Sequence, residues 1–112
     1  MAERLERNLD FIKVLTKARP KQRKAILHTA DRDLILCLCE IILNFLTGNL
    51  KVPDKIITQL KKHKTCLRRL AQRDTKLEDR RHLLEQKGGF LPVLLAPILS
   101  VAGQLLAEAI VK

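Results

Sequence analysis

The chain has 112 residues without tryptophan or tyrosine, and its aromatic side chains are Phe11, Phe45 and Phe90. Proteins that bind single-stranded bases usually offer aromatic platforms for stacking, so this shortage disfavours a base-stacking protein. The three cysteines form no CxxC pair, and two of them lie inside an apolar run. That pattern is typical of buried thiols in a reducing compartment. Residues 1–10 lack the apolar stretch of a signal peptide, so we expect an intracellular protein.

Catalytic and metal-binding patterns are also missing. No Ser/His/Asp set, glycine-rich phosphate loop or paired carboxylates stand out. His63 and Cys66 would share a helix face, but Cys37 and Cys39 would point to different sides of theirs. A four-ligand zinc site would therefore need distortion. The sequence predicts no enzymatic activity, no catalytic residues, no metal site and no cofactor.

Positive charge is abundant instead. Lysine and arginine number 22 against 12 aspartate and glutamate residues, a formal net charge of +10. Between Lys51 and Lys87 there are 12 cations and 5 anions. So short a chain forms one domain at most with a modest core. Its charge favours a polyanion or an anionic membrane as partner.

Hydrophobic spacing and helix breakers predict an all-α fold, a small helical bundle. The predicted helices are Ala2–Ala18, Pro20–Ala30, Arg32–Thr47, Asp54–Gln72 and Lys76–Lys87. Asp31 or Asp33 is the expected cap of the third helix, and Gly48 its stop. This helix is apolar nearly all round, so we expect it at the centre of the bundle. The S/T-x-x-E pattern from Thr75 to Glu78 predicts a capping box at the start of the fifth.

The fourth predicted helix carries the clearest functional signal, because its cations lie opposite an isoleucine and leucine stripe. Several cations on one face can meet a phosphate backbone together. The candidate nucleic-acid-binding residues are Lys55, Lys61, Lys62, Lys64, Arg68, Arg69 and Arg73. Lys21, Arg23 and Lys24 form an auxiliary patch in the second helix, where cations oppose the helix dipole. A solvated helix face is the alternative interpretation.

The composition changes abruptly at Gly88 and Gly89. We therefore divide the chain into a basic helical bundle, 1–87, and an apolar segment, 88–112, which begins with the Gly-Gly junction. Between Phe90 and Val111 the one ionisable side chain is Glu108, and Pro92, Pro97 and Gly103 predict a kinked or broken helix. The segment is either the last helix of the bundle, an oligomer contact or a membrane segment. Its candidate membrane or partner contacts are Phe90, Leu91, Val93, Leu94, Leu95, Ile98 and Leu99.

Two stretches resemble a known family: ARPKQRKAILHTADRDLILCLCEIILNFLTGNLKV, residues 18–52, and LRRLAQRDTKLEDRRHLLEQKGGFLPVLLAPIL, residues 67–99. They are similar to a small basic protein encoded beside capsid genes in Maverick or Polinton transposons and adintoviruses. The resemblance implies a virion component, similar to the adenovirus basic core peptide, that condenses packaged double-stranded DNA. It also implies a location in the host nucleus and the virion. Adenoviral core peptides are rich in arginine and lack a core, whereas this chain has an apolar central helix.

The resemblance gives the Gly-Gly junction a further meaning. Adenovirus-type proteases cut after Gly-Gly when an aliphatic residue stands two positions earlier. Gln86 occupies that position, so the candidate cleavage site at Gly88 and Gly89 departs from the pattern. Cleavage after Gly89 would release residues 90–112 as an apolar peptide able to enter the headgroup boundary of a membrane.

Three functions follow as expectations. The first is a non-enzymatic protein of a virus-like element that binds or condenses double-stranded DNA without sequence preference. The second is a membrane-active or membrane-anchored protein that uses the apolar segment and meets anionic lipid through its basic face. The third is a helical adaptor that forms a homo-oligomer through the C-terminal segment.

Overall fold

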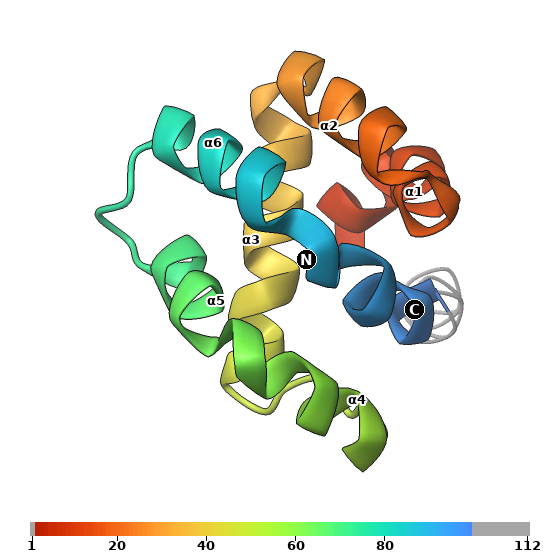
Figure 1. The fold of residues 1–112 in the computed structure, drawn as a ribbon, viewed down its shortest axis with the longest axis vertical. Helices are drawn as coiled ribbons and strands as arrows, with labels where there is room; N and C mark the ends of the chain where they lie inside the picture. The colour runs from red at the N-terminus through yellow and green to blue at the C-terminus, as the bar shows by residue number, and fades with distance from the viewer. Residues whose placement is uncertain (1, 100–112) are drawn as a thin grey trace.

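In a computed structural model, residues 2–99 are described, and they form helices and no strand. The elements are α1 (Ala2–Lys17), α2 (Pro20–Thr29), α3 (Arg32–Leu46), α4 (Asp54–Leu60), the 3-10 turn η1 (Lys61–His63), α5 (Lys64–Ala71), α6 (Leu77–Lys87) and the 3-10 turn η2 (Gly88–Phe90). Residues 91–99 continue as a further helix (Figure 1). The predicted all-α bundle is confirmed.

Local signals explain most of the helix ends. Pro20 starts α2, where its missing amide proton is not needed. The Asp31 side chain accepts a hydrogen bond from the Leu34 amide at 2.9 Å and so caps α3. Gly48 takes a φ of +79° just past the end of α3, a conformation that costs glycine little. These ends match the sequence prediction to within a residue or two.

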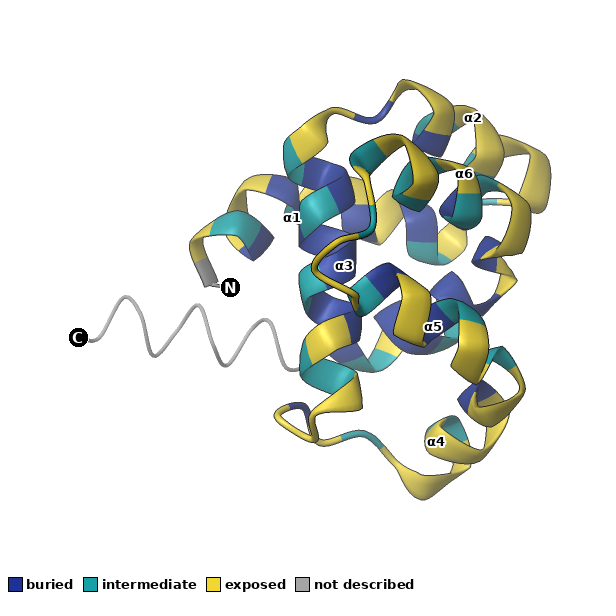
Figure 2. Ribbon diagram, turned by 90° about the vertical axis from the view of Figure 1, so that its left-hand side faces the viewer, coloured by how far each residue is buried: buried dark blue, intermediate teal, exposed yellow. Residues whose placement is uncertain are grey.

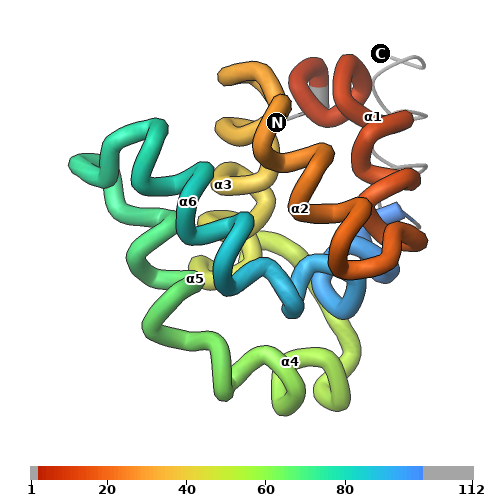
Figure 3. The backbone as a smooth tube through the Cα atoms, turned by 45° about the horizontal axis from the view of Figure 1, so that its top comes forward, coloured from red at the N-terminus to blue at the C-terminus, as the bar shows by residue number. Residues whose placement is uncertain are grey.

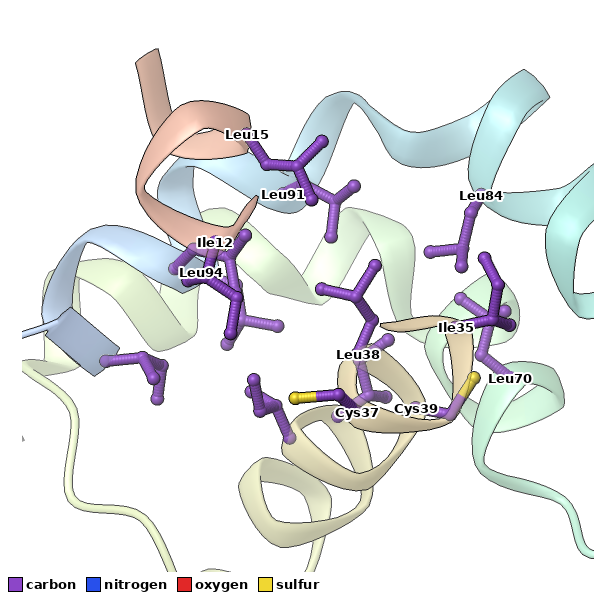
Figure 4. Close-up of a cluster of buried hydrophobic side chains, with 14 of the residues drawn as sticks. Ile12, Leu15, Ile35, Cys37, Leu38, Cys39, Leu70, Leu84, Leu91 and Leu94 are labelled. Atoms are coloured by element: carbon purple, nitrogen blue, oxygen red, sulfur yellow. The ribbon is translucent and has the colours of Figure 1, made fainter. Parts of the chain in front are cut away.

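The central position of α3 is confirmed, because α1, α5 and α6 all pack against it. Figure 4 shows Leu38 pointing into the middle of the cluster, with Ile35 turned toward Leu70 of α5 and Leu84 of α6. Buried residues follow α3 along most of its length, and the outward faces of the surrounding helices are exposed (Figure 2). The buried α3 residues are Leu34, Ile35, Cys37, Leu38, Cys39, Ile41 and Ile42.

The predicted fourth helix is not continuous. It breaks at η1, where His63 leaves helical geometry with φ −103° and ψ 10°. No proline or glycine marks the break. The His63 ring instead packs on Phe90, with ring centroids 5.6 Å apart, a contact between residues 27 positions apart. A tertiary contact of this kind accompanies the change of direction from α4 to α5.

The predicted capping box at Thr75 and Glu78 is wrong. The N-cap of α6 is Lys76, and its side chain makes no capping hydrogen bond. The Thr75 hydroxyl donates at 2.7 Å to the carbonyl of Arg69, near the end of α5. Thr75 therefore stabilises the turn between α5 and α6 rather than the start of α6.

Arg81 joins α2 to α6. Its guanidinium donates to the carbonyls of Leu27, at 3.0 Å, and of His28 and Ala30. The last carbonyls of a helix have no partner within the helix, and a cation there also complements the helix dipole. His28 and Glu85 add a second link across the same interface at 3.0 Å. The two contacts fix α6 against α2.

The apolar segment begins inside the core rather than outside it. Gly88 is buried, and a Cβ atom there would lie 3.3 Å from Leu91 Cδ1. Leu91 points toward Leu15 of α1, and Leu94 toward Ile12 (Figure 4). Residues 91–99 form one continuous helix that includes Pro92 and Pro97, so the predicted break does not occur within them. The remainder of the segment, with Gly103 and Glu108, lies outside the described residues.

This burial corrects the expected membrane or partner contacts. Phe90 and Ile98 are 1% exposed, and Leu91, Leu94 and Leu95 are fully buried. Val93 and Leu99 are half-buried against the same cluster. In this conformation the five buried side chains contact the protein's own core and are not available to a membrane. The bond after Gly89 joins this exposed glycine to the buried Phe90 within the 3-10 turn η2, so cleavage there would require local opening.

A polar network holds α1 on α3. Asp33 accepts from both Arg7 Nε and Nη2, at 3.2 and 3.1 Å, and from Arg4 Nε at 3.1 Å. The buried Asn8 amide donates to Asp33 at 2.8 Å and to the Arg4 carbonyl at 2.8 Å. Hydrogen bonds from Arg7 and Asn8 lower the pKa of Asp33 to about 2, because they favour the charged carboxylate.

Replacing a core residue of the final helix should destabilise the whole protein. We expect Leu94→Ala to lower the free energy of unfolding by about 2–5 kcal/mol, because Leu94 is fully buried. Urea denaturation followed by circular dichroism measures this. Gly89→Ala is the control and should change the value by less than about 1 kcal/mol, since nothing lies within 4 Å of a Cβ there. An unchanged midpoint for Leu94→Ala would contradict the packing of this helix.

Acid should selectively weaken the α1–α3 contact. The pKa of Asp33 is lower in the folded state than its ordinary 3.8. Its stabilising effect is therefore present above about pH 4 and lost as the pH falls toward 2. Asp33→Asn should lower stability at pH 7, and its deficit relative to the wild type should shrink between pH 4 and pH 2 in urea titrations. Asp10→Asn, at an exposed carboxylate of α1, is the control. A deficit independent of pH would contradict the role of the charge.

Candidate nucleic-acid interface

The basic face centres on α5. Leu67 and Leu70 are 1% and 0% exposed and anchor this helix on α3. Lys64, Arg68 and Arg69 lie on the exposed side of α5, and Lys61 and Lys62 of η1 are exposed beside them. The separation of apolar and basic residues that the sequence predicts is therefore present in α5.

A second helix extends this face. Figures 1 and 3 show α6 between α2 and α5. Lys87 at the end of α6 joins Lys62 and Arg69 around a hollow of about 500 Å³, which we name the α5–α6 hollow. Its other lining residues are His63, Thr65, Cys66 and Leu83. Three cations and no carboxylate line it among the described residues.

Two of the three acidic residues of α6, Glu78 and Glu85, help to explain this asymmetry. Glu78 contacts Arg81 at 3.5 Å, and Glu85 contacts His28 of α2. Residues 78, 81 and 85 share one helix face, and residues 83 and 87 lie on the opposite one. Glu78 and Glu85 are thus turned toward α2, and Lys87 toward α5. Within residues 2–99, the ion pairs involve Arg4, Arg7, His28 and Arg81 and none of the cations of η1 and α5.

The charge of the hollow depends on its lysine and arginine residues. Burial, and then the charge of Lys62, lower the pKa of His63 below 6.5, so its imidazole is uncharged at neutral pH. Burial raises the pKa of the Cys66 thiol, although Lys87 and Arg69 oppose this shift. Cys66 therefore stays protonated. An anion in the hollow would meet the side chains of Lys62, Arg69 and Lys87, with the Thr65 hydroxyl as a further donor.

The remaining candidate residues do not form one surface. Lys61 and Lys64 also border an apolar groove with Phe45, Leu46 and Ile57. Lys55 lies on α4, beyond the break at η1, and Arg73 lies after α5 near Arg4 and Arg80. The auxiliary patch, Lys21, Arg23 and Lys24, lies on α2, which Figure 1 shows at the opposite end of the molecule from α4. The structure brings Lys62, Arg69 and Lys87 together around the α5–α6 hollow, and Lys61, Lys64 and Arg68 are exposed elsewhere on η1 and α5.

Sequence reasoning missed Lys87 as a member of the interface. It ends α6, 18 residues after Arg69, and local periodicity cannot show that two separate helices lie side by side. Its position in the last turn before Gly88 is an ordinary place for a lysine at a helix end. His63 and Cys66, whose spacing would suit two ligands of a metal site, line the hollow as well. Within residues 2–99, no three His, Cys, Asp or Glu side chains are grouped as a metal site would require.

Neither membrane-spanning character nor similarity to known proteins gives a guide to the function. None of the helices in the described part of the chain has the length and apolar character needed to cross a bilayer. Comparisons of the chain with protein-family profiles, curated protein sequences and solved structures find no match.

The three thiols should differ in reactivity. Burial raises the pKa of Cys37 to about 12 and of Cys39 to about 11, whereas Cys66 is only half-buried. Because the thiolate is the reactive form, iodoacetamide at pH 8 should modify Cys66 first. Intact-mass measurements with peptide mapping follow the reaction, and all three thiols should react in urea. Modification of Cys37 or Cys39 as fast as Cys66 in the folded protein would contradict this arrangement.

Proposed function

We propose that this protein binds double-stranded DNA without sequence preference, through η1, α5 and the end of α6. The observation that carries the proposal is a set of six exposed basic residues on η1, α5 and the end of α6, none of them in an ion pair with another of residues 2–99. These interface cations are Lys61, Lys62, Lys64, Arg68, Arg69 and Lys87. Cations that neutralise phosphates release counterions from DNA, which gives binding that depends on salt and not on base sequence.

The dimensions of α5 suit a duplex. An α-helix rises 1.5 Å per residue, so the eight residues of α5 span about 12 Å. Duplex DNA carries one negative charge per about 1.7 Å of its axis, so about seven phosphate charges lie within that length. Lys64, Arg68 and Arg69 lie within that length, and Lys61 and Lys62 of η1 and Lys87 of α6 lie beyond it. The face can therefore meet several phosphates of one duplex at once.

The aromatic residues support phosphate contact over base stacking. Phe90 is buried beneath His63, and Phe45 is half-buried. Phe11 is exposed, but it lies on α1, away from the interface. The described interface thus offers no aromatic platform of the kind that binds single-stranded bases.

The family resemblance supports the same proposal. A protein similar to the small basic core peptide of adenoviruses would condense DNA inside a virion, and this chain would do so as a folded bundle. The membrane alternative has less support, because the apolar residues it depends on are buried as far as Ile98.

Neutralising the hollow should reduce the salt dependence of DNA binding. The triple variant Lys62→Gln, Arg69→Gln, Lys87→Gln removes three phosphate contacts, so the slope of log K against log salt should become shallower by about 0.9 per contact. Fluorescence anisotropy with two duplexes of unrelated sequence, between 50 and 200 mM salt, measures slope and specificity together. The full-length protein should bind both duplexes equally.

A matched triple variant distinguishes DNA binding at the hollow from a general effect of the protein's net charge. Lys13→Gln, Lys17→Gln, Arg32→Gln removes the same charge from exposed positions on α1 and α3. It should reduce binding less than the hollow variant does. Equal losses would show that only net charge matters, and no binding by the wild type at low salt would remove the proposal altogether.

A further inference from the structure

A second surface lies between α1 and α2. Lys13, Val14 and Lys17 of α1, with Ala18, face Gln22, Ala25 and Ile26 of α2 across a groove of about 670 Å³. Val14 is 51% exposed, and Phe11, three residues earlier on the same helix, is 53% exposed. These are the two largest exposures among the bulky apolar residues described. The surface therefore leaves apolar area in contact with water, which is a sign of an interaction site.

The groove combines an apolar floor with a basic border. Val14, Ala18, Ala25 and Ile26 provide the floor, and Lys13 and Lys17 stand along one side. None of its described lining residues is acidic, although Asp10 lies one turn earlier on α1. The first turn of α2, beside the groove, likewise contains no acidic residue. An occupant must supply apolar side chains and negative charge together.

We propose that this α1–α2 groove binds an acidic amphipathic helix of a partner protein. Such a helix lays apolar residues spaced three and four apart into a groove and keeps its charges at the edge. Carboxylates on the partner would meet Lys13 and Lys17, and its leucine or isoleucine side chains would cover Val14 and Ile26. The small side chains of Ala18 and Ala25 allow the partner helix to approach the groove closely.

Two other occupants fit less well. DNA would gain nothing from the apolar floor, because phosphates need donors and cations. A bilayer favours several protruding bulky apolar residues, whereas of those that line the groove Val14 is exposed and Ile26 is half-buried. The proposal is independent of the DNA-binding function, since the groove shares no residue with the interface cations.

A display selection tests the proposal with a defined probe. The library consists of 16-residue peptides with Leu, Ile or Ala at positions spaced three and four apart, and Glu, Gln or Lys at the flanking positions. It is selected on immobilised full-length protein at physiological salt. We expect glutamate-rich flanks to be enriched. Enrichment of lysine or glutamine, or no enrichment over the starting library, would overturn the proposal.

Variants then locate the bound peptide. Val14→Glu adds a charge at an exposed apolar position, and Lys13→Glu with Lys17→Glu reverses the border; each should weaken binding by about tenfold or more. Leu43→Glu is the matched control, because Leu43 is 45% exposed but lies on α3 outside the groove. The Leu43→Glu variant should bind the peptide normally, and so should the triple variant Lys62→Gln, Arg69→Gln, Lys87→Gln. Equal weakening by Leu43→Glu would overturn the proposal.

The oligomeric state distinguishes a partner protein from a second copy of this chain. Sedimentation of the wild type over a range of concentrations should show a monomer, because the proposed occupant is another protein. Self-association that Val14→Glu abolishes would overturn the proposal and assign the groove to a second copy. Circular dichroism of each variant confirms that it is folded before binding is measured.

Discussion

The apolar circumference of α3 determines how the rest of the chain is arranged. A helix with a single apolar stripe can leave its other side in water, but α3 buries residues from Leu34 to Ile42 on several sides. Each of those sides needs a covering helix. Helices α1, α5 and α6 provide the cover, and the helix over residues 91–99 closes the cluster through Leu91 and Leu94. Covering helices need only one apolar stripe each, so their outer faces are available for charge.

The distribution of acidic residues then decides where the positive charge accumulates. Asp33 and Glu40 on α3 pair with Arg4 and Arg7, which attaches α1. On α6, Glu85 pairs with His28 of α2. Helix α5 receives no such pairing among the described residues, and its buried Leu67 and Leu70 pack it on α3. A basic interface on α5 therefore does not disturb the contacts that stabilise the fold, because its cations play no part in them.

Sequence reasoning succeeded where the determining residues are local. Pro20, Asp31 and Gly48 act within a few residues of their own positions, and the composition of α3 itself predicts its burial. It failed where the partner lies outside the local pattern. The break at His63 is accompanied by a ring contact with Phe90, 27 positions away, and the Thr75 hydroxyl donates to the Arg69 carbonyl, six positions earlier, instead of capping α6. Lys87 joins the interface only because the turn at residues 72–76 brings α6 beside α5.

Composition alone also predicts a boundary at Gly88, although the residues directly after it are packed in the core. Local composition changes sharply there, but small buried glycine allows the chain to pass close to Leu27 and Leu91 without leaving the core. Phe90 then supports His63, which borders the α5–α6 hollow. The apolar residues directly after the junction thus support the basic face from beneath. If that face binds DNA, residues 90–98 contribute to binding through the fold, without touching the nucleic acid themselves.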